Sequence, residues 1–214
     1  MEDYPALHHY SHEQARAYES RRFRRLRGRT VDALEWLLVR RCVAHLEGCG
    51  GPLHTILDVP IGTGRMARRL RARGYNVTGL DASVDMLAMA RRAHAAHAYE
   101  VGRAEHLPFP DESYDAVVSV RLFGHLPSGA QADALKEFHR VARRGAVVFF
   151  AGDTKWLRMR RACQGRRERR VRSWNPVSPS DMRALADQAG FRVLHMTGLL
   201  GPYTETKAVT LVPK

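Results

Sequence analysis

The chain has 214 residues, of which 44% are hydrophobic, and a formal net charge of +13. This length fits one domain with a single core, and the apolar fraction excludes a wholly disordered chain. No apolar run approaches the roughly 20 residues of a membrane-spanning helix. The N-terminus lacks the basic and then apolar order of a secretory signal. The three cysteines include no C-x-x-C pair, which argues against a disulfide framework or a zinc site. We therefore expect a cytoplasmic protein that binds no metal.

The positive charge is concentrated in two short segments. Residues 21–29 hold six arginines and no acid, and residues 158–172 hold eight arginines against one acid, Glu168. Outside them, basic and acidic residues are equal in number. The two segments form either a surface for an anionic partner or solvated arginine-rich faces.

The apolar spacing predicts helices before the first strand and an alternation of strands and helices after it. Residues 12–46 are predicted to be helical, with a break into two helices at Gly28. Strands are predicted over residues 54–60, 76–81, 99–103, 114–120, 146–151, 191–196 and 208–212. Helices are predicted over residues 65–73, from an N-cap at Ser83, over 131–141 and over 180–189. The alternation indicates an α/β fold, with a mostly parallel seven-stranded sheet covered by helices on both faces. We assign residues 1–50 to an N-terminal helical lid and residues 51–214 to the core.

The most informative segment is residues 56–65, Ile-Leu-Asp-Val-Pro-Ile-Gly-Thr-Gly-Arg. It reads as a strand that ends at Asp58, a tight glycine turn and the start of a helix. Glycines let a ligand approach the backbone closely, and the free N–H groups at the helix start can bind it. Asp81 ends the next strand, where a carboxylate can accept hydrogen bonds from both hydroxyls of a ribose. The two strand ends predict a nucleotide site.

The same turn also permits a different enzyme class. Residues 62–67 satisfy the loose G-x-G-x-x-[GA] pattern of an NAD(P)-dependent oxidoreductase. Asp58 weighs against this alternative, because a carboxylate there repels a pyrophosphate and attracts a ligand ammonium group. The glycine turn also follows some fifty residues of predicted helix instead of opening the chain.

Four motifs in order resemble those of the class I S-adenosylmethionine-dependent methyltransferases, in particular the methyltransferase type 11 group. They are Asp58–Gly64; Gly79–Ser83 with Met86; Gly102–Phe109 followed by Ser113–Val117; and Arg140–Gly145. The resemblance covers residues 54–150 well. It implies a Rossmann-like doubly wound fold and S-adenosylmethionine as cofactor, with S-adenosylhomocysteine as product.

The chain departs from the family pattern at two positions. Pro60 replaces the first glycine of the first motif, which stiffens the turn and removes one N–H group. Arg103 replaces the aspartate that accepts from the adenine amino group, so Glu105 or the neighbouring backbone would supply that contact.

The resemblance also implies which positions contact the cofactor. By this resemblance, the N-terminal helices of the chain would close over the cofactor, and Tyr18 and Arg22 would reach the methionine end of the cofactor. Arg121 either contacts the adenosine or the acceptor, or holds its own loop. The implied contacts in the core are Asp58, Pro60, Gly62, Thr63, Gly64, Asp81, Ala82, Ser83, Met86, Ala104, Glu105, Val120 and Arg121.

Methyl transfer from a sulfonium is an in-line displacement, so the protein must mainly align the reactants and exclude water. A general base is required only if the acceptor is protonated at neutral pH. His125 follows the fourth predicted strand on the acceptor side, and we regard it as a candidate base or orienting residue. The alternative is a histidine that packs or caps the loop. Residues 153–178 are the candidate acceptor cap, in which Trp156 and Trp174 either stack on a planar acceptor or fill the core.

The sequence therefore predicts a methyltransferase for a small molecule, such as a specialised metabolite, because the core carries no appended recognition domain. An RNA or other anionic polymer is the alternative acceptor, although residues 158–172 contain no aromatic side chain for base stacking. An NAD(P)-dependent oxidoreductase and a non-enzymatic cofactor-binding module are further alternatives. A monomer and a homodimer are both compatible with the sequence.

Overall fold

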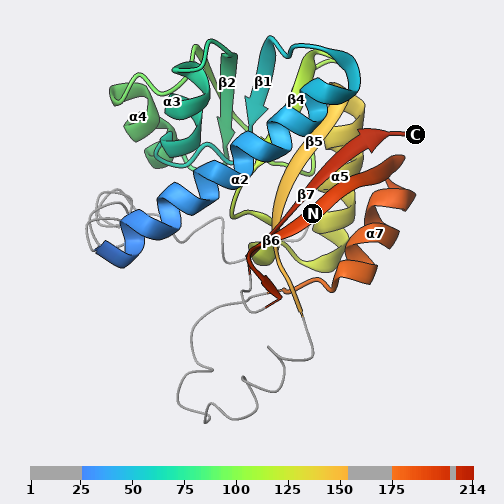
Figure 1. The fold of residues 1–214 in the computed structure, drawn as a ribbon. Coiled ribbons are helices and arrows are strands. Elements are labelled where there is room, and N and C mark those ends of the chain that lie inside the picture. Colours follow the sequence, from blue (N-terminus) through green and yellow to red (C-terminus); the bar gives the residue numbers. More distant parts are fainter. Residues whose placement is uncertain (1–25, 154–174, 203–205) are drawn as a thin grey trace.

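The computed structural model describes residues 26–153, 175–202 and 206–214, and within these residues seven strands form one sheet (Figure 1). Their order is β3-β2-β1-β4-β5-β7-β6, and all neighbours are parallel except that β7 runs antiparallel to β5 and β6. This confirms the predicted mostly parallel, Rossmann-like sheet. The strands are β1 (Thr55–Asp58), β2 (Asn76–Asp81), β3 (Ala98–Val101), β4 (Tyr114–Ser119), β5 (Ala142–Ala151), β6 (Phe191–Pro202) and β7 (Thr206–Pro213).

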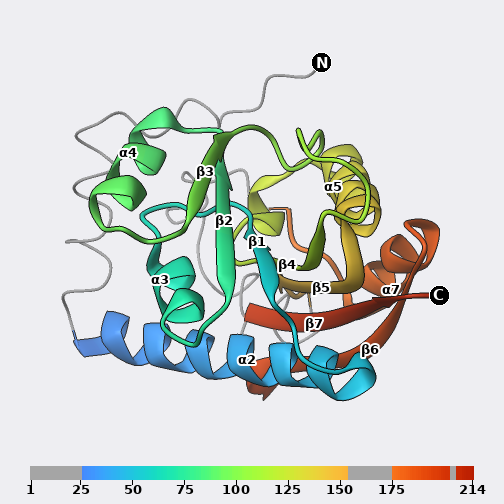
Figure 2. The same ribbon diagram turned by 90° about the horizontal axis from the view of Figure 1, so that it is seen from above.

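Helices cover both faces of the sheet, as predicted (Figure 2). One layer consists of α2 (Leu26–Gly50), α3 (Arg65–Arg71) and α4 (Val84–Arg92). The other consists of α5 (Ser128–Val141) and α7 (Pro179–Gln188). A short 3-10 turn, η2 (Phe123–His125), follows β4.

Successive residues of the central strands alternate between the two layers. In β1, Ile56 packs toward α2 and α3, whereas Leu57 packs toward α5. In β4, Val118 and Val117 divide in the same way. Both faces of these strands are buried, and this is why their sequences read as nearly continuous apolar runs.

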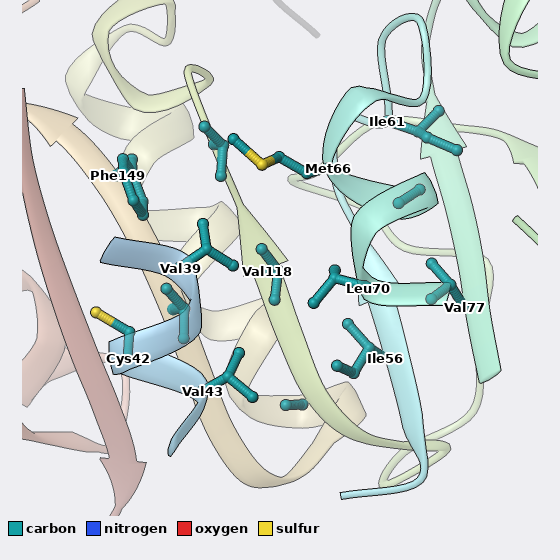
Figure 3. Packing of buried hydrophobic residues seen from close by; sticks show 14 of the residues in the cluster. Val39, Cys42, Val43, Ile56, Ile61, Met66, Leu70, Val77, Val118 and Phe149 are labelled. Carbon is teal, nitrogen blue, oxygen red and sulfur yellow. The ribbon is translucent and has the colours of Figure 1, made fainter. Parts of the chain in front are cut away.

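The predicted break at Gly28 is wrong, because α2 begins at Leu26 and continues through this glycine to Gly50. The cost of a glycine inside a helix is only about 1 kcal/mol, and burial of the apolar side of α2 outweighs it. Val39 and Cys42 lie in the same core cluster as the sheet residue Phe149 (Figure 3). Residues 26–50 thus share a core with the sheet, and the rest of the predicted lid lies outside the described residues.

The start of β5 also differs from the prediction, because the strand begins at Ala142 and not at residue 146. Asp115 in β4 is bonded to this extension. Its Oδ1 accepts from the Arg143 guanidinium (Nη2–Oδ1 2.8 Å), and its Oδ2 accepts from the N–H groups of His54 and Thr55 at 2.8 and 2.9 Å. One nearly buried carboxylate therefore joins β1, β4 and β5 at the edge of the sheet where the parallel strands begin.

The hydrogen bonds to Asp115 also determine its protonation. Burial by itself raises the pKa of this carboxyl, but the bonds from Arg143, Thr55 and His54 outweigh it and hold the pKa well below the usual value. The charged form is therefore favoured in the folded state, as expected for a carboxylate with several donors. No helix in the described part of the chain has the length and hydropathy needed to cross a bilayer.

We predict that Asp115→Asn lowers the free energy of unfolding by about 1–3 kcal/mol at pH 7, because an amide cannot accept from all of these donors. A carboxyl whose pKa is lower in the folded state stabilises the protein fully at pH values above its unfolded-state pKa. This stabilisation is lost as the pH falls through the folded-state pKa. Urea unfolding from pH 7 down to pH 3 should therefore show the difference between wild type and variant shrinking on acidification. Asp133→Asn, which removes an exposed ion pair with Lys136, is the control and should have little effect. A difference that is constant with pH would contradict this role.

Candidate functional site

The glycine turn lies between β1 and α3, on the side of the sheet formed by the C-terminal ends of the parallel strands. Ile61 donates to the Leu80 carbonyl at 2.9 Å, and Gly64 donates to the Ile61 carbonyl at 2.9 Å, which closes the turn against β2. The Val59–Pro60 peptide bond is cis. Gly64 has a φ of 83°, and a Cβ there would lie 2.1 Å from the Cβ of Ala95, so no other residue fits. At Gly62, which has a φ of 54°, the space around a Cβ is open. The turn is thus packed on one side and accessible on the other.

Asp81, at the end of β2, is bonded to this turn. Its Oδ2 accepts from the Gly62 N–H at 2.8 Å, and its Oδ1 accepts from the Ser83 N–H at 2.9 Å. Burial raises the pKa of Asp81 to about 6, although the backbone hydrogen bonds oppose this shift. Each oxygen can accept a second hydrogen bond, so the carboxylate holds the turn and retains capacity for a ligand hydroxyl. The Ser83 hydroxyl accepts from the Met86 N–H at 3.3 Å, which confirms Ser83 as the N-cap of α4.

Asp58, at the end of β1, is only 1% exposed, and its Oδ2 has no hydrogen-bond partner within the described residues. Burial raises the pKa of this carboxyl to about 8, while Arg65 and the Ala67 N–H lower it and Asp81 adds to the rise. A buried polar oxygen without a partner is costly and uncommon in native proteins. The position therefore suits a ligand that brings a hydrogen-bond donor or a positive charge.

Beyond β3, the side chain of Arg103 is directed at a neighbouring acid. Its Nε and Nη2 both donate to Oε1 of Glu105, at 2.8 and 2.5 Å. A guanidinium has no acceptor atom, so Arg103 cannot take the part of the family's aspartate toward an adenine amino group. Glu105, which the sequence proposed for that contact, is thus oriented by Arg103. Ala104 between them is buried.

The loop after β4 carries the candidate acceptor-side residues. Val120 is buried, and Arg121 has a φ of 65°, in the left-handed region that non-glycine residues rarely adopt. The Arg121 guanidinium pairs with Glu35 of α2 (Nη2–Oε1 2.5 Å). His125 lies half-buried in η2, and its N–H donates to the Leu122 carbonyl at 2.8 Å.

Two amide side chains, one buried and one half-buried, hold this loop. Gln131 in α5 is 2% exposed, and its Nε2 donates to the carbonyls of Phe123 at 2.7 Å and of Asn175 at 3.2 Å. Asn175 in turn donates its N–H to the Gly124 carbonyl at 2.8 Å and its Nδ2 to the Leu126 carbonyl at 3.0 Å. The chain that returns at residue 175 is therefore bonded directly to the turn that contains His125.

The sequence analysis missed a set of charged residues that connects α2 to the site. Asp32 and Glu35 of α2 bind Arg65 and Arg69 of α3, and Glu35 also binds Arg121. Glu35 could have been noticed because it falls between Val31 and Val39 on the apolar side of the predicted helix, where an acid needs a partner. Its partners, however, are distant in sequence.

The remaining sequence-predicted site residues fall into two groups. Thr63 in the turn and Met86 in α4 are buried, whereas Ala82, just before α4, is exposed. Tyr18, Arg22 and most of both arginine segments lie outside the described residues, as do Trp156 and Trp174. Among the residues that the structure describes, no three His, Cys, Asp or Glu side chains gather in a way that could hold a metal ion.

Comparisons with known proteins indicate a methyltransferase domain. A family described as a methyltransferase domain matches residues 57–150. Malonyl-[acyl-carrier protein] O-methyltransferase of Salmonella typhimurium is 35% identical over 165 residues, which are 76% of this chain and 55% of that protein. The enzyme of the same name from Serratia marcescens is 39% identical over 107 residues, 49% of this chain and 40% of that protein. Demethylmenaquinone methyltransferase of Chlorobaculum parvum is 40% identical over 118 residues, 53% and 47% of the two chains. The chain spans about half the length of these curated relatives.

The solved structures support the same fold. Magnesium protoporphyrin IX methyltransferase from Synechocystis, with bound S-adenosylhomocysteine, superposes with a TM-score of 0.71 at 18% identity and covers 89% of this chain and 88% of that one. The methyltransferase-domain match and the relatives decide against the NAD(P)-dependent oxidoreductase alternative. The motif order, the domain match and the seven-stranded sheet identify residues 57–150 as a methyltransferase domain with the class I, S-adenosylmethionine-dependent fold.

Proposed function

We propose that this chain transfers a methyl group from S-adenosylmethionine to a small-molecule acceptor. The observation that carries the proposal is the oxygen of buried Asp58 that has no partner in the described part of the chain, next to a glycine turn and one strand away from Asp81. This set suits a ligand with both an ammonium group and a ribose. The relatives are named for acting on malonyl-[acyl-carrier protein] and on demethylmenaquinone, and these names support a small acceptor group.

The residues present fit such a cofactor without rearrangement of the turn. Asp58 would face the ammonium group, Asp81 would accept from the ribose hydroxyls, and the open side of Gly62 would admit the ligand to the backbone. When bound, S-adenosylmethionine supplies a methyl group already activated on a sulfonium. Glu105 would accept from the adenine amino group. The remaining proposed contacts are Pro60, Thr63, Gly64, Ala82, Ser83, Met86, Ala104, Val120 and, outside the described residues, Tyr18 and Arg22.

The acceptor would lie beside η2. The described chain continues two residues beyond β5 to Asp153 and resumes at Asn175, and Asp153 donates its N–H to the Val177 carbonyl at 3.1 Å. The two ends of the intervening segment are therefore held together next to the turn that carries His125. These contacts support residues 153–178 as the acceptor cap, and His125 as the side chain that orients the acceptor or removes its proton.

The proposal can be tested by following the methyl label. Purified protein with methyl-labelled S-adenosylmethionine should transfer label to the small-molecule fraction of an extract from the source organism, and not to its RNA. The reason is that the described residues of the site form a tight turn between two strand ends and include no array of base-stacking aromatic side chains. Label that appears in RNA, and that declines steeply with added salt, would instead support the polymer alternative.

Cofactor binding should also release a proton from Asp58. Its carboxyl, with a pKa of about 8, is mostly protonated at pH 7 in the free protein, and an ammonium group placed beside it lowers that pKa. Binding should therefore strengthen as the pH rises toward 8, with release of up to about one proton. Calorimetry in buffers of different ionisation enthalpy measures this release. Asp58→Asn has the same shape and no proton to lose, so it separates this release from titration of the ligand's amino group. Equal proton release by both proteins would contradict the assignment.

If His125 removes a proton from the acceptor, His125→Gln should lower turnover by about 10²- to 10⁴-fold. Binding of S-adenosylhomocysteine should be unchanged, because η2 lies on the acceptor side. The measurement is single-turnover transfer to the acceptor identified by the label. His54→Gln is a suitable control, since that exposed histidine precedes β1 at the opposite edge of the sheet. Undiminished turnover in His125→Gln would assign His125 a packing or capping role.

A further inference from the structure

The buried carboxylate of Glu35 contacts two loops of the cofactor site at once. Glu35 is 1% exposed, and its Oε2 accepts from Nη2 of Arg65 at 2.8 Å and from Nε of Arg121 at 3.1 Å. Its Oε1 pairs with Nη2 of Arg121 at 2.5 Å. Both oxygens are therefore occupied by guanidinium groups, and Arg121 binds in the two-point manner that fixes its orientation.

The two arginines that bind Glu35 lie at different loops of the site. Arg65 is the first residue of α3 and directly follows Gly64, so its side chain is anchored to the glycine turn. Arg121 lies between β4 and η2, in the loop that leads to His125. One side chain of α2 thus joins the turn on the cofactor side to the loop on the acceptor side.

A second acid strengthens the connection between α2 and α3. Asp32, three residues before Glu35 and hence on the same side of the helix, binds Arg65 and also Arg69 (Nη2–Oδ2 2.5 Å). Among the described residues, the ion pairs of Asp32 are with α3, whereas Glu35 also pairs with the β4–η2 loop. The coupling of the two loops therefore depends on Glu35.

From this geometry we infer that Glu35 is a positioning residue, which sets the relative placement of the glycine turn and the β4–η2 loop, and that Arg121 acts through Glu35. The left-handed backbone at Arg121 supports this, because such a conformation persists only where its surroundings hold it. Loss of the Glu35 charge would leave two arginines beside each other without their shared partner. The inference rests on the cofactor assignment and is independent of the acceptor.

The test is a double-mutant cycle with S-adenosylhomocysteine as the probe. Glu35→Gln and Arg121→Gln should each weaken binding about tenfold or more, and the double variant should bind no worse than the weaker single variant, because both remove one interaction. Hydrogen exchange should rise in peptides covering residues 61–65 and 120–125 and stay unchanged in β5 and β7. A role in global stability alone would raise exchange in all of them. Asp133→Asn should alter neither measurement.

Two results would overturn the inference. Losses of affinity that add up in the double variant would mean that Arg121 contacts the ligand independently of Glu35. Unchanged affinity and unchanged local exchange in Glu35→Gln would mean that the contact does not position the loops. If Glu35→Gln fails to fold, Arg121→Lys replaces it, since it keeps the charge and loses the two-point contact. That variant should show the same local rise in exchange, and its absence would equally overturn the inference. A wild-type chain that does not bind the probe would instead contradict the cofactor assignment.

Discussion

The glycine turn and the start of α4 depend on the hydrogen bonds that Asp81 accepts from Gly62 and Ser83. Through them one carboxylate fixes the glycine turn against the end of β2 and orients the first turn of α4. The turn in turn places the start of α3, and with it Arg65, against α2. A change in the position of this carboxylate would therefore displace the glycine turn and the first turn of α4.

Three buried carboxylates at this edge differ in their partners, and the partners explain their roles. Asp81 has backbone donors and acts as a fixed acceptor. Glu35 has two arginines and acts as a structural connection. Asp58 has an oxygen without a partner within the described residues and a pKa raised to about 8, which supports its proposed role in binding a ligand. The surroundings of each carboxylate thus distinguish the three.

The carboxylates at the two ends of the parallel strands differ in their surroundings. At the edge where the parallel strands begin, Asp115 binds backbone N–H groups and Arg143, and its pKa is depressed, which is typical of a group that stabilises the fold. At the edge where they end, burial raises the pKa of Asp58 and Asp81. Stabilising and functional carboxylates are thereby separated by the length of the strands, as in open α/β sheets generally.

The sequence by itself determined the features that depend on neighbouring residues. Apolar runs located the central strands, the glycines after β1 located the turn, and acids at two strand ends indicated where a ligand would bind, because strand periodicity and turn chemistry act over a few residues. Only the tertiary structure decided that α2 continues through Gly28, that β7 lies antiparallel between β5 and β6, and that Arg121 binds Glu35, 86 residues away. These outcomes depend on which surfaces meet when the chain packs. A local pattern carries no record of a partner so distant in sequence.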